Sequence, residues 1–156
     1  MLRLSITLSL LMSSSATIAQ EGRFAIQCRG MSTMADTITG SLLTSSDDLP
    51  KQVYVLDAAR DLVEHALEPR QEFESVCDSK KDSRFVSFSK GLISVHSTGT
   101  MESGTEIVCD FSINRLSGNA ELVHRMSFSG GRYNEYRWIM KCEPDVIPTF
   151  NSPRKF

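Results

Sequence analysis

Apolar and polar residues alternate along several segments of this chain, most regularly between residues 107 and 142. In the last of these runs, Tyr136, Trp138 and Met140 occupy every second position. A period of two places successive side chains on opposite faces of the backbone and is typical of half-buried antiparallel strands. Three such runs are separated by short connecting segments that are rich in the turn-forming residues Gly, Asn and Ser and have the length typical of hairpin turns. The pattern therefore predicts a β-meander over residues 107–142.

Similar short runs occur earlier in the chain. They span residues 24–28, 52–57, 86–89 and 92–97. Residues 31–50 hold many Ser, Thr and Asp residues and predict a loop or an irregular edge strand. Together these segments predict a mainly β domain, a single antiparallel meander that curls into a small barrel or half-barrel.

Residues 57–67 fit both a helix and a hairpin. Apolar residues recur there at helical spacing, with Asp57 as a candidate cap and Pro69 as a stop. Val63 and other apolar residues in the same segment also alternate with polar ones. Because the polar turn after Asp57 resembles the one after Ile113, we favour the hairpin. The domain then contains at most one short helix.

The first residues have the composition of a secretory leader. Arg3 precedes an apolar stretch over residues 4–12, and the small residues Thr17 and Ala19 fit the −3 and −1 positions of a cleavage site. The apolar stretch is shorter than the ~20 residues that span a bilayer. We predict a signal peptide over residues 1–19.

The leader sets the expected organisation of the rest of the chain. Cleavage would leave a mature protein that starts at Gln20 or Glu21, with one β-rich domain over residues 20–143. Residues 144–156 contain three prolines and predict an extended C-terminal tail. We expect an exported protein, periplasmic or secreted, without a membrane span.

Four cysteines fall in this mature part: Cys28, Cys77, Cys109 and Cys142. In an oxidising compartment an even number predicts disulfides, whereas zinc sites favour close pairs such as C-x-x-C. Cys28 and Cys142 lie on the apolar faces of the first and last strands, which become neighbours if the sheet curls until its ends meet. Cys109 lies on the apolar face of a middle strand. Of three connectivities, we predict Cys28–Cys142 and Cys77–Cys109.

The length and the net charge of the chain restrict the class of protein. The chain has 156 residues, with 17 Lys and Arg against 19 Asp and Glu, and a net charge of −2. The length favours one domain. The charge argues against nucleic-acid binding, which normally requires a basic surface.

A set of short motifs resembles a group of small exported β-proteins common in alphaproteobacteria. In chain order the motifs are Phe24-Ala-Ile-Gln-Cys28, Val86-Ser-Phe-Ser89, Ile113-Asn-Arg115 with Gly118, and Lys141-Cys142. That group has a cysteine in its first strand, a later I-D/N-R-x-x-G hairpin and a final strand that ends in cysteine. The resemblance implies an exported β fold and transfers no activity.

The search for chemistry finds no catalytic or metal-binding constellation. His65, His96 and His124 lie in three different predicted hairpins, so they would form a zinc site only if folding brings them together. Ser129 lies in a Ser-Gly-Gly turn rather than in a G-x-S-x-G nucleophile motif. Pairs of acidic residues fall in polar or turn segments, where solvated charge explains them. We predict no enzyme activity and no cofactor or metal.

One patch in the last hairpin combines aromatic and cationic residues: Tyr133, Tyr136, Trp138, Arg132 and Arg137. Alternation directs Tyr136 and Trp138 to the core and Arg137 outward. A core strand with a solvated back explains the patch most simply. The functional alternatives are an apolar pocket lined at the mouth of the barrel and an exposed surface that binds another protein.

Three functions are compatible with these observations. The chain is a non-enzymatic protein that acts through surface contacts with a protein partner, a carrier of a small apolar ligand, or an unrecognised hydrolase. Large residues expected to point inward would fill a small barrel: Phe111, Met126, Phe128, Trp138 and Met140. We therefore favour surface contacts, while an open cavity of several hundred Å³ would favour the carrier.

Overall fold

The computed structural model describes residues 22–36, 41–46, 49–78 and 81–150. The predicted leader and the predicted start of the mature chain lie outside these residues. Within the described ranges, no helical segment is long and apolar enough to cross a membrane.

Ten strands and two 3-10 turns make up the described secondary structure. They are β1 (Arg23–Asp36), β2 (Ser41–Ser46), β3 (Gln52–Asp57), η1 (Ala58–Arg60), β4 (Leu62–Leu67), η2 (Glu68–Arg70), β5 (Glu72–Ser75), β6 (Lys81–Phe88), β7 (Leu92–Thr100), β8 (Glu106–Asn114), β9 (Asn119–Ser127) and β10 (Tyr133–Asp145).

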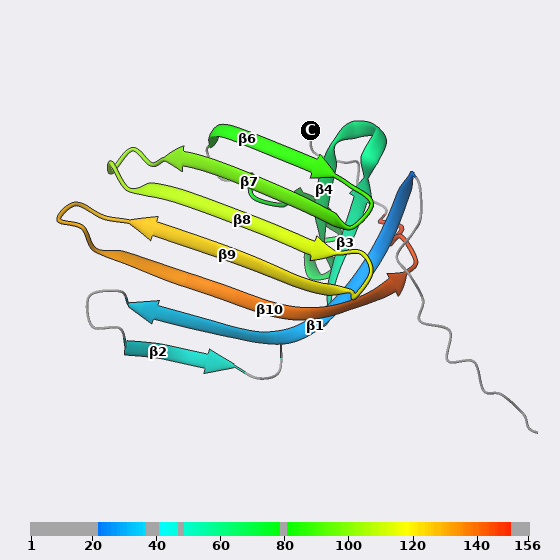
Figure 1. Ribbon diagram of the computed structural model, residues 1–156, viewed down its shortest axis with the longest axis horizontal. Helices are drawn as coiled ribbons and strands as arrows, with labels where there is room; N and C mark the ends of the chain where they lie inside the picture. Colours follow the sequence, from blue (N-terminus) through cyan, green and yellow to red (C-terminus); the bar gives the residue numbers. More distant parts are fainter. Residues whose placement is uncertain (1–21, 37–40, 47–48, 79–80, 151–156) are drawn as a thin grey trace, which may run out of the picture.

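The strands form one antiparallel sheet in the order β5-β4-β3-β1-β10-β9-β8-β7-β6. One edge of β1 pairs with β3 through Arg23–Cys28 and with β2 through Ser32–Asp36. β3 and β4 cross behind the ends of β7 and β8, so the sheet curls over itself at one end (Figure 1). The expected mainly β, antiparallel half-barrel is confirmed. We call β3, β4 and β5 the arm.

Both predicted disulfides are present, Cys28–Cys142 and Cys77–Cys109. Cys28 and Cys142 are register partners in the long β1–β10 pair. However, these two strands are neighbours at the centre of the strand order, which ends in β5 and β6. The first disulfide therefore links central strands instead of closing a barrel, whereas the second ties the segment after the arm to β8.

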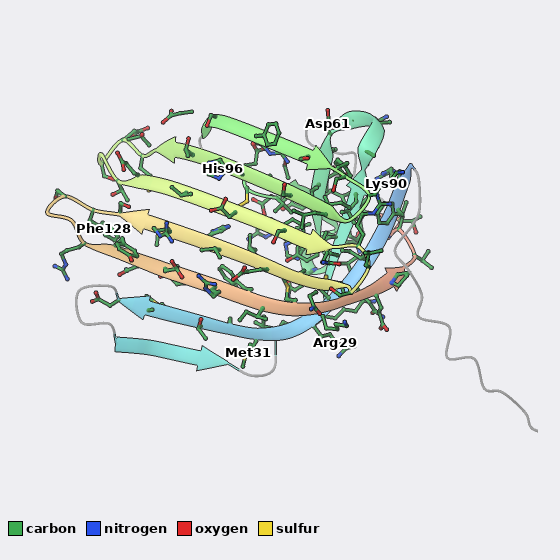
Figure 2. All side chains as sticks on the ribbon, viewed as in Figure 1. Arg29, Met31, Asp61, Lys90, His96 and Phe128 are labelled. Atoms are coloured by element: carbon green, nitrogen blue, oxygen red, sulfur yellow. A yellow bond between two sulfur atoms is a disulfide. The ribbon has the colours of Figure 1, made fainter. Side chains whose placement is uncertain are left out.

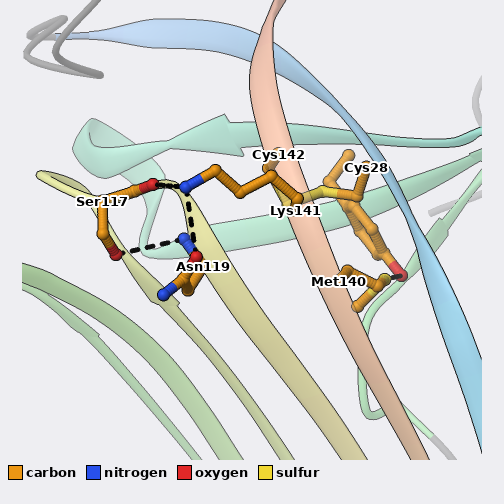
Figure 3. The surroundings of a disulfide bond; sticks show 7 residues. Cys28, Ser117, Asn119, Met140, Lys141 and Cys142 are labelled. Carbon is orange, nitrogen blue, oxygen red and sulfur yellow. Dashed lines mark hydrogen bonds between the residues drawn. A yellow bond between two sulfur atoms is a disulfide. The ribbon is translucent and has the colours of Figure 1, made fainter. Parts of the chain in front are cut away.

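Two glycines allow the backbone to pack closely around the first disulfide. A Cβ atom on Gly30 would lie 2.0 Å from the carbonyl oxygen of Ile139 in β10. Gly118 has φ +70°, and the amide of Cys142 donates a hydrogen bond to its carbonyl at 2.8 Å. Beside it, the ammonium of Lys141 donates to the carbonyl of Ser117 (Figure 3).

Residues 57–67 form the favoured hairpin, in which Asp57 pairs with Leu62 across η1. Asp61 ends this turn with φ 48°, in the left-handed region. Aspartate and asparagine adopt this conformation more readily than most other residues that carry a side chain. The next turn, before β5, repeats the arrangement with Gln71 at φ 50°. Two similar hairpins therefore build the arm.

The main core lies between the arm and the concave face of the sheet. Its largest fully buried side chains include Phe111, Ile26 and Leu56. The ring of Tyr54 packs on the ring of Phe111 with centroids 5.1 Å apart, which brings β3 against β8. The two layers are therefore in direct apolar contact here.

A second, smaller core lies on the other face of the arm. Val53, Val55 and Ala66 are buried there, and Ile147 and Phe150 of the C-terminal segment pack against them. The segment expected to be a simple extended tail thus covers the back of the arm, and β10 itself continues to Asp145.

At the opposite end, the sheet has a single layer. Side chains in Ser32–Asp36, Arg125–Ser127 and Tyr133–Arg137 are half-buried whichever face they occupy. Met126 is half-buried and Phe128 is 39% exposed (Figure 2), so the prediction that they fill the interior is wrong. The arm does not reach far enough along the sheet to cover them.

Candidate functional site

A cavity of about 420 Å³ lies where the arm faces β9 and β10. One wall comes from the arm, the other from the concave face of β9 and β10, and the segment after β5 closes one side. The volume falls within the ~300–1,000 Å³ typical of small-molecule pockets.

The arm contributes a row of side chains across three strands. Tyr54 of β3 is the register partner of His65 in β4, which is the partner of Glu74 in β5. Directly opposed residues share a face of the sheet, so all three point to the cavity side. The rings of Tyr54 and His65 stack with centroids 5.1 Å apart. Gln52 continues this wall toward β1.

The facing wall comes from Leu122 and His124 of β9 and Trp138 of β10. Leu122 and Trp138 are register partners. His124 meets the indole of Trp138 edge to face, with ring centroids 5.5 Å apart. This contact orients both rings along the side of the cavity.

Residues 75–78 form the third side of the cavity. The amide of Val76 donates a hydrogen bond to the carbonyl of Val63 at 2.8 Å, and Cys77 has φ 60°. Arg84 of β6 donates from its guanidinium to the carbonyl of Val76 at 3.3 Å. The Cys77–Cys109 disulfide then fixes this segment to β8, beside His124, the register partner of Cys109.

Burial keeps the ring side chains of the cavity uncharged near neutral pH. It lowers the pKa of His124, and it lowers the pKa of His65 against the opposing effect of the Glu74 carboxylate. Burial also raises the pKa of the Tyr54 hydroxyl. Among the described residues of the lining, Glu74 and Asp78 are the acidic ones, and both are exposed at the mouth.

The aromatic and cationic patch of the last hairpin divides between the two faces, as alternation predicted. Trp138 lines the cavity, and Tyr136 stacks near it with centroids 6.3 Å apart. Tyr133 lies on the opposite, convex face under the guanidinium of Arg125, 5.3 Å from the ring centroid. Arg132 is exposed in the turn.

Ion pairs organise that convex face. The Glu135 carboxylate accepts hydrogen bonds from Arg125 at 2.8 Å and Arg137 at 2.9 Å, and Arg137 also contacts Glu121. The two arginines lower the pKa of Glu135 by hydrogen bonding and charge. This network gives Arg137 a structural role on the outside of the sheet.

The three histidines do not come together. His65 and His124 face the same cavity, whereas His96 lies on the outer face of β7 (Figure 2), with Nδ1 2.6 Å from Oδ1 of Asp110. In the described part of the chain, one group of potential metal ligands lies within 4.8 Å: Cys77, Cys109 and His124. Its two sulfur atoms are bonded to each other, so they offer no thiolate to a metal.

Asp57 and Ser129, two further residues considered in the sequence, lie away from the cavity. Asp57 is buried at 6% exposure and pairs with Arg60 at 3.7 Å, which holds the first turn of the arm. Ser129 is exposed in the turn between β9 and β10. Neither residue lies at the cavity.

Tyr54 and Glu74 were not predicted from the sequence as site residues, and His65 was not paired with His124. Tyr54 lies in a short apolar run that indicates only a strand. The signal that would have helped is hairpin register, because the spacing of residues 54, 65 and 74 places them opposite one another once two four-residue turns are assumed. Nothing local indicated that β9 faces the arm.

Comparison of the chain with protein-family models, with curated proteins and with solved structures found no match in any of the three. The geometry of the cavity therefore carries the functional argument.

Proposed function

We propose that this protein is a non-enzymatic binding protein that holds a small organic molecule in the cavity between the arm and β9–β10. The observation that carries the proposal is the cavity itself, about 420 Å³ in volume. An interior filled by side chains would instead favour a function through surface contacts. Phe111 and Met140 are indeed buried, but Trp138 lines an open space instead of filling it.

The construction of the site supports this proposal. A disulfide and the stacked pair of Tyr54 and His65 hold its walls in place, which reduces the entropy lost when a ligand binds. The walls combine apolar rings with a few polar atoms, as ligand pockets commonly do. Export to the periplasm or the medium is part of the proposal, supported by the leader-like first residues and two disulfides.

Native mass spectrometry of protein purified gently from the exported fraction tests the proposal. We expect a constant excess mass that disappears on denaturation. Leu122→Trp, which places an indole in the cavity, should lose this mass. Val123→Trp on the convex face of the same strand is the matched control and should retain it. A bare mass for the unmodified protein would contradict the proposal.

Contact with a protein partner is the second candidate. Met31 and Ile139, register partners on the convex face, are 38% and 50% exposed, and Arg29 flanks them (Figure 2). Exposed apolar side chains rimmed by charge are typical of contact surfaces. Cross-linking in the exported fraction should yield one dominant adduct that Ile139→Glu abolishes. An unchanged adduct pattern would exclude this surface.

A further inference from the structure

We infer that the ligand of this cavity is a small organic cation with a flat ring, an arylalkylamine in chemical class, with its ring between the two walls and its ammonium group at Glu74. This inference rests on the proposed function and specifies what the same site binds. It comes from three features of the site: the rings on its walls, the acidic residues at its mouth and the position of Arg84.

The walls favour a flat molecule. Tyr54 and His65 lie on one side and His124 and Trp138 on the other, so rings line both. Aromatic rings pack best against other flat groups in offset or edge-to-face contact. The faces of Tyr and Trp also attract cations, so an alkylammonium group joined to an aromatic ring by a short chain gains on both counts.

The mouth favours a positive charge. Among the described residues of the lining, the acidic ones are Glu74 and Asp78, and none is Lys or Arg. In the described part of the chain, Glu74 forms no ion pair with Lys or Arg. A carboxylate near apolar walls binds an ammonium group and disfavours a carboxylate ligand through like-charge repulsion.

Arg84, which contacts the lining segment at Val76, does not cancel this preference. Arg84 lies near Asp78, whose charge raises the arginine pKa against the effect of burial. Its guanidinium is held by the carbonyl of Val76. Arg84 therefore offsets the charge of Asp78 and leaves Glu74 as the carboxylate available to a ligand.

Three probes of one shape and different charge separate the contributions. Phenethylamine is a cation at neutral pH, phenethyl alcohol is neutral, and hydrocinnamate is an anion. Trp138 is the single tryptophan of the chain and lines the cavity, so its fluorescence reports occupancy directly. Calorimetry on the same samples gives the affinities.

We expect phenethylamine to bind about 10-fold more tightly than phenethyl alcohol, the factor that corresponds to one charge-assisted hydrogen bond, and hydrocinnamate to bind weakest. Glu74→Gln should reduce the preference for the amine to less than about 3-fold without changing the affinity for the alcohol. Glu106→Gln, an exposed strand glutamate on the convex face, is the matched control and should leave all three affinities unchanged.

The outcomes separate this inference from the proposed function. Equal binding of amine and alcohol, or tightest binding of hydrocinnamate, would overturn the cation assignment and leave a binding cavity. Amine binding that survives Leu122→Trp would place the amine outside the cavity and overturn the assignment. If no probe binds and native mass spectrometry finds bare protein, both the inference and the proposed function fail.

Discussion

The two ends of β10 have the same alternating sequence but different surroundings. Met140 and Cys142 are buried beneath the arm, whereas Tyr136 and Trp138, earlier on the same face, are only half-buried. On the opposite face Ile139 is exposed near the arm, as alternation requires, but the contrast between faces vanishes over Tyr133–Trp138. Alternation therefore indicates a strand with two different faces, and a second layer of chain decides whether one of them is buried.

The two regions are also stabilised differently. The covered region has the apolar core and both disulfides, while the single-layer region relies on long strand pairing and on the Arg125–Glu135–Arg137 ion pairs. Partly exposed ion pairs contribute little each. We therefore expect mutations in the covered region to have larger effects, and the following predictions test this difference in order of size.

Removal of a disulfide should produce the largest loss. Cys28→Ala with Cys142→Ala opens a link over a sequence separation of 114, and Cys77→Ala with Cys109→Ala a link over 32. The chain-entropy model gives losses of roughly 5 and roughly 4 kcal/mol in the free energy of unfolding. Chemical denaturation measures both. The second variant should also bind phenethylamine more weakly, since it frees residues 75–78, and full affinity in that variant would contradict their role as a wall.

Two methionines on the concave face provide a matched pair. Met140 is 4% exposed beneath the arm, and Met126 is half-buried in the single layer. Met140→Ala leaves a cavity and should lower the free energy of unfolding by about 2–5 kcal/mol. Met126→Ala should cost about 1 kcal/mol or less, because water already reaches the site. Equal losses in urea denaturation would refute the distinction between the regions.

Gly30 lies at the boundary between the regions, after the last β3 partner and before the first β2 partner of β1. Gly30→Ala places a methyl group against the backbone of β10 and should cost about 1–3 kcal/mol. Gly91→Ala is the control, because a Cβ there meets nothing within 4 Å, and should change stability by less than about 0.5 kcal/mol. Thermal unfolding of both variants checks this, and a tolerated Gly30→Ala would show that β1 and β10 can separate locally.

The smallest expected effect is a dependence on pH from His124. Because burial lowers its pKa, the unfolded chain takes up a proton at a higher pH than the folded protein does. Acidification from about pH 7 to about pH 5 should therefore destabilise the fold. His65 acts in the same direction, whereas the raised pKa of Glu64 acts in the opposite one. His124→Gln should flatten the stability profile, and a profile as steep as that of the unmodified protein would contradict the assignment.

Local patterns were sufficient to predict most of the strands, the 57–67 hairpin and both disulfides, but not β5 or the extension of β1 to Asp36. They worked because alternation, turn residues and cysteine placement are properties of short segments. The site was harder to predict from the sequence: Trp138 was identified as a candidate, but Tyr54 and Glu74 were not. Their role depends on the arm lying across β9, a contact between segments about 70 residues apart that no local pattern records.

The central position of β1 has a consequence for how the chain folds. β1 pairs with β3 on one edge soon after both are made, but its other edge waits for β10, whose partner residues are 98 to 120 positions away in sequence. Contacts so distant in sequence raise the contact order and slow folding. Until β10 arrives, β1 presents an unpaired strand edge to other chains. The competition between folding and aggregation therefore depends on β10, the last strand in chain order.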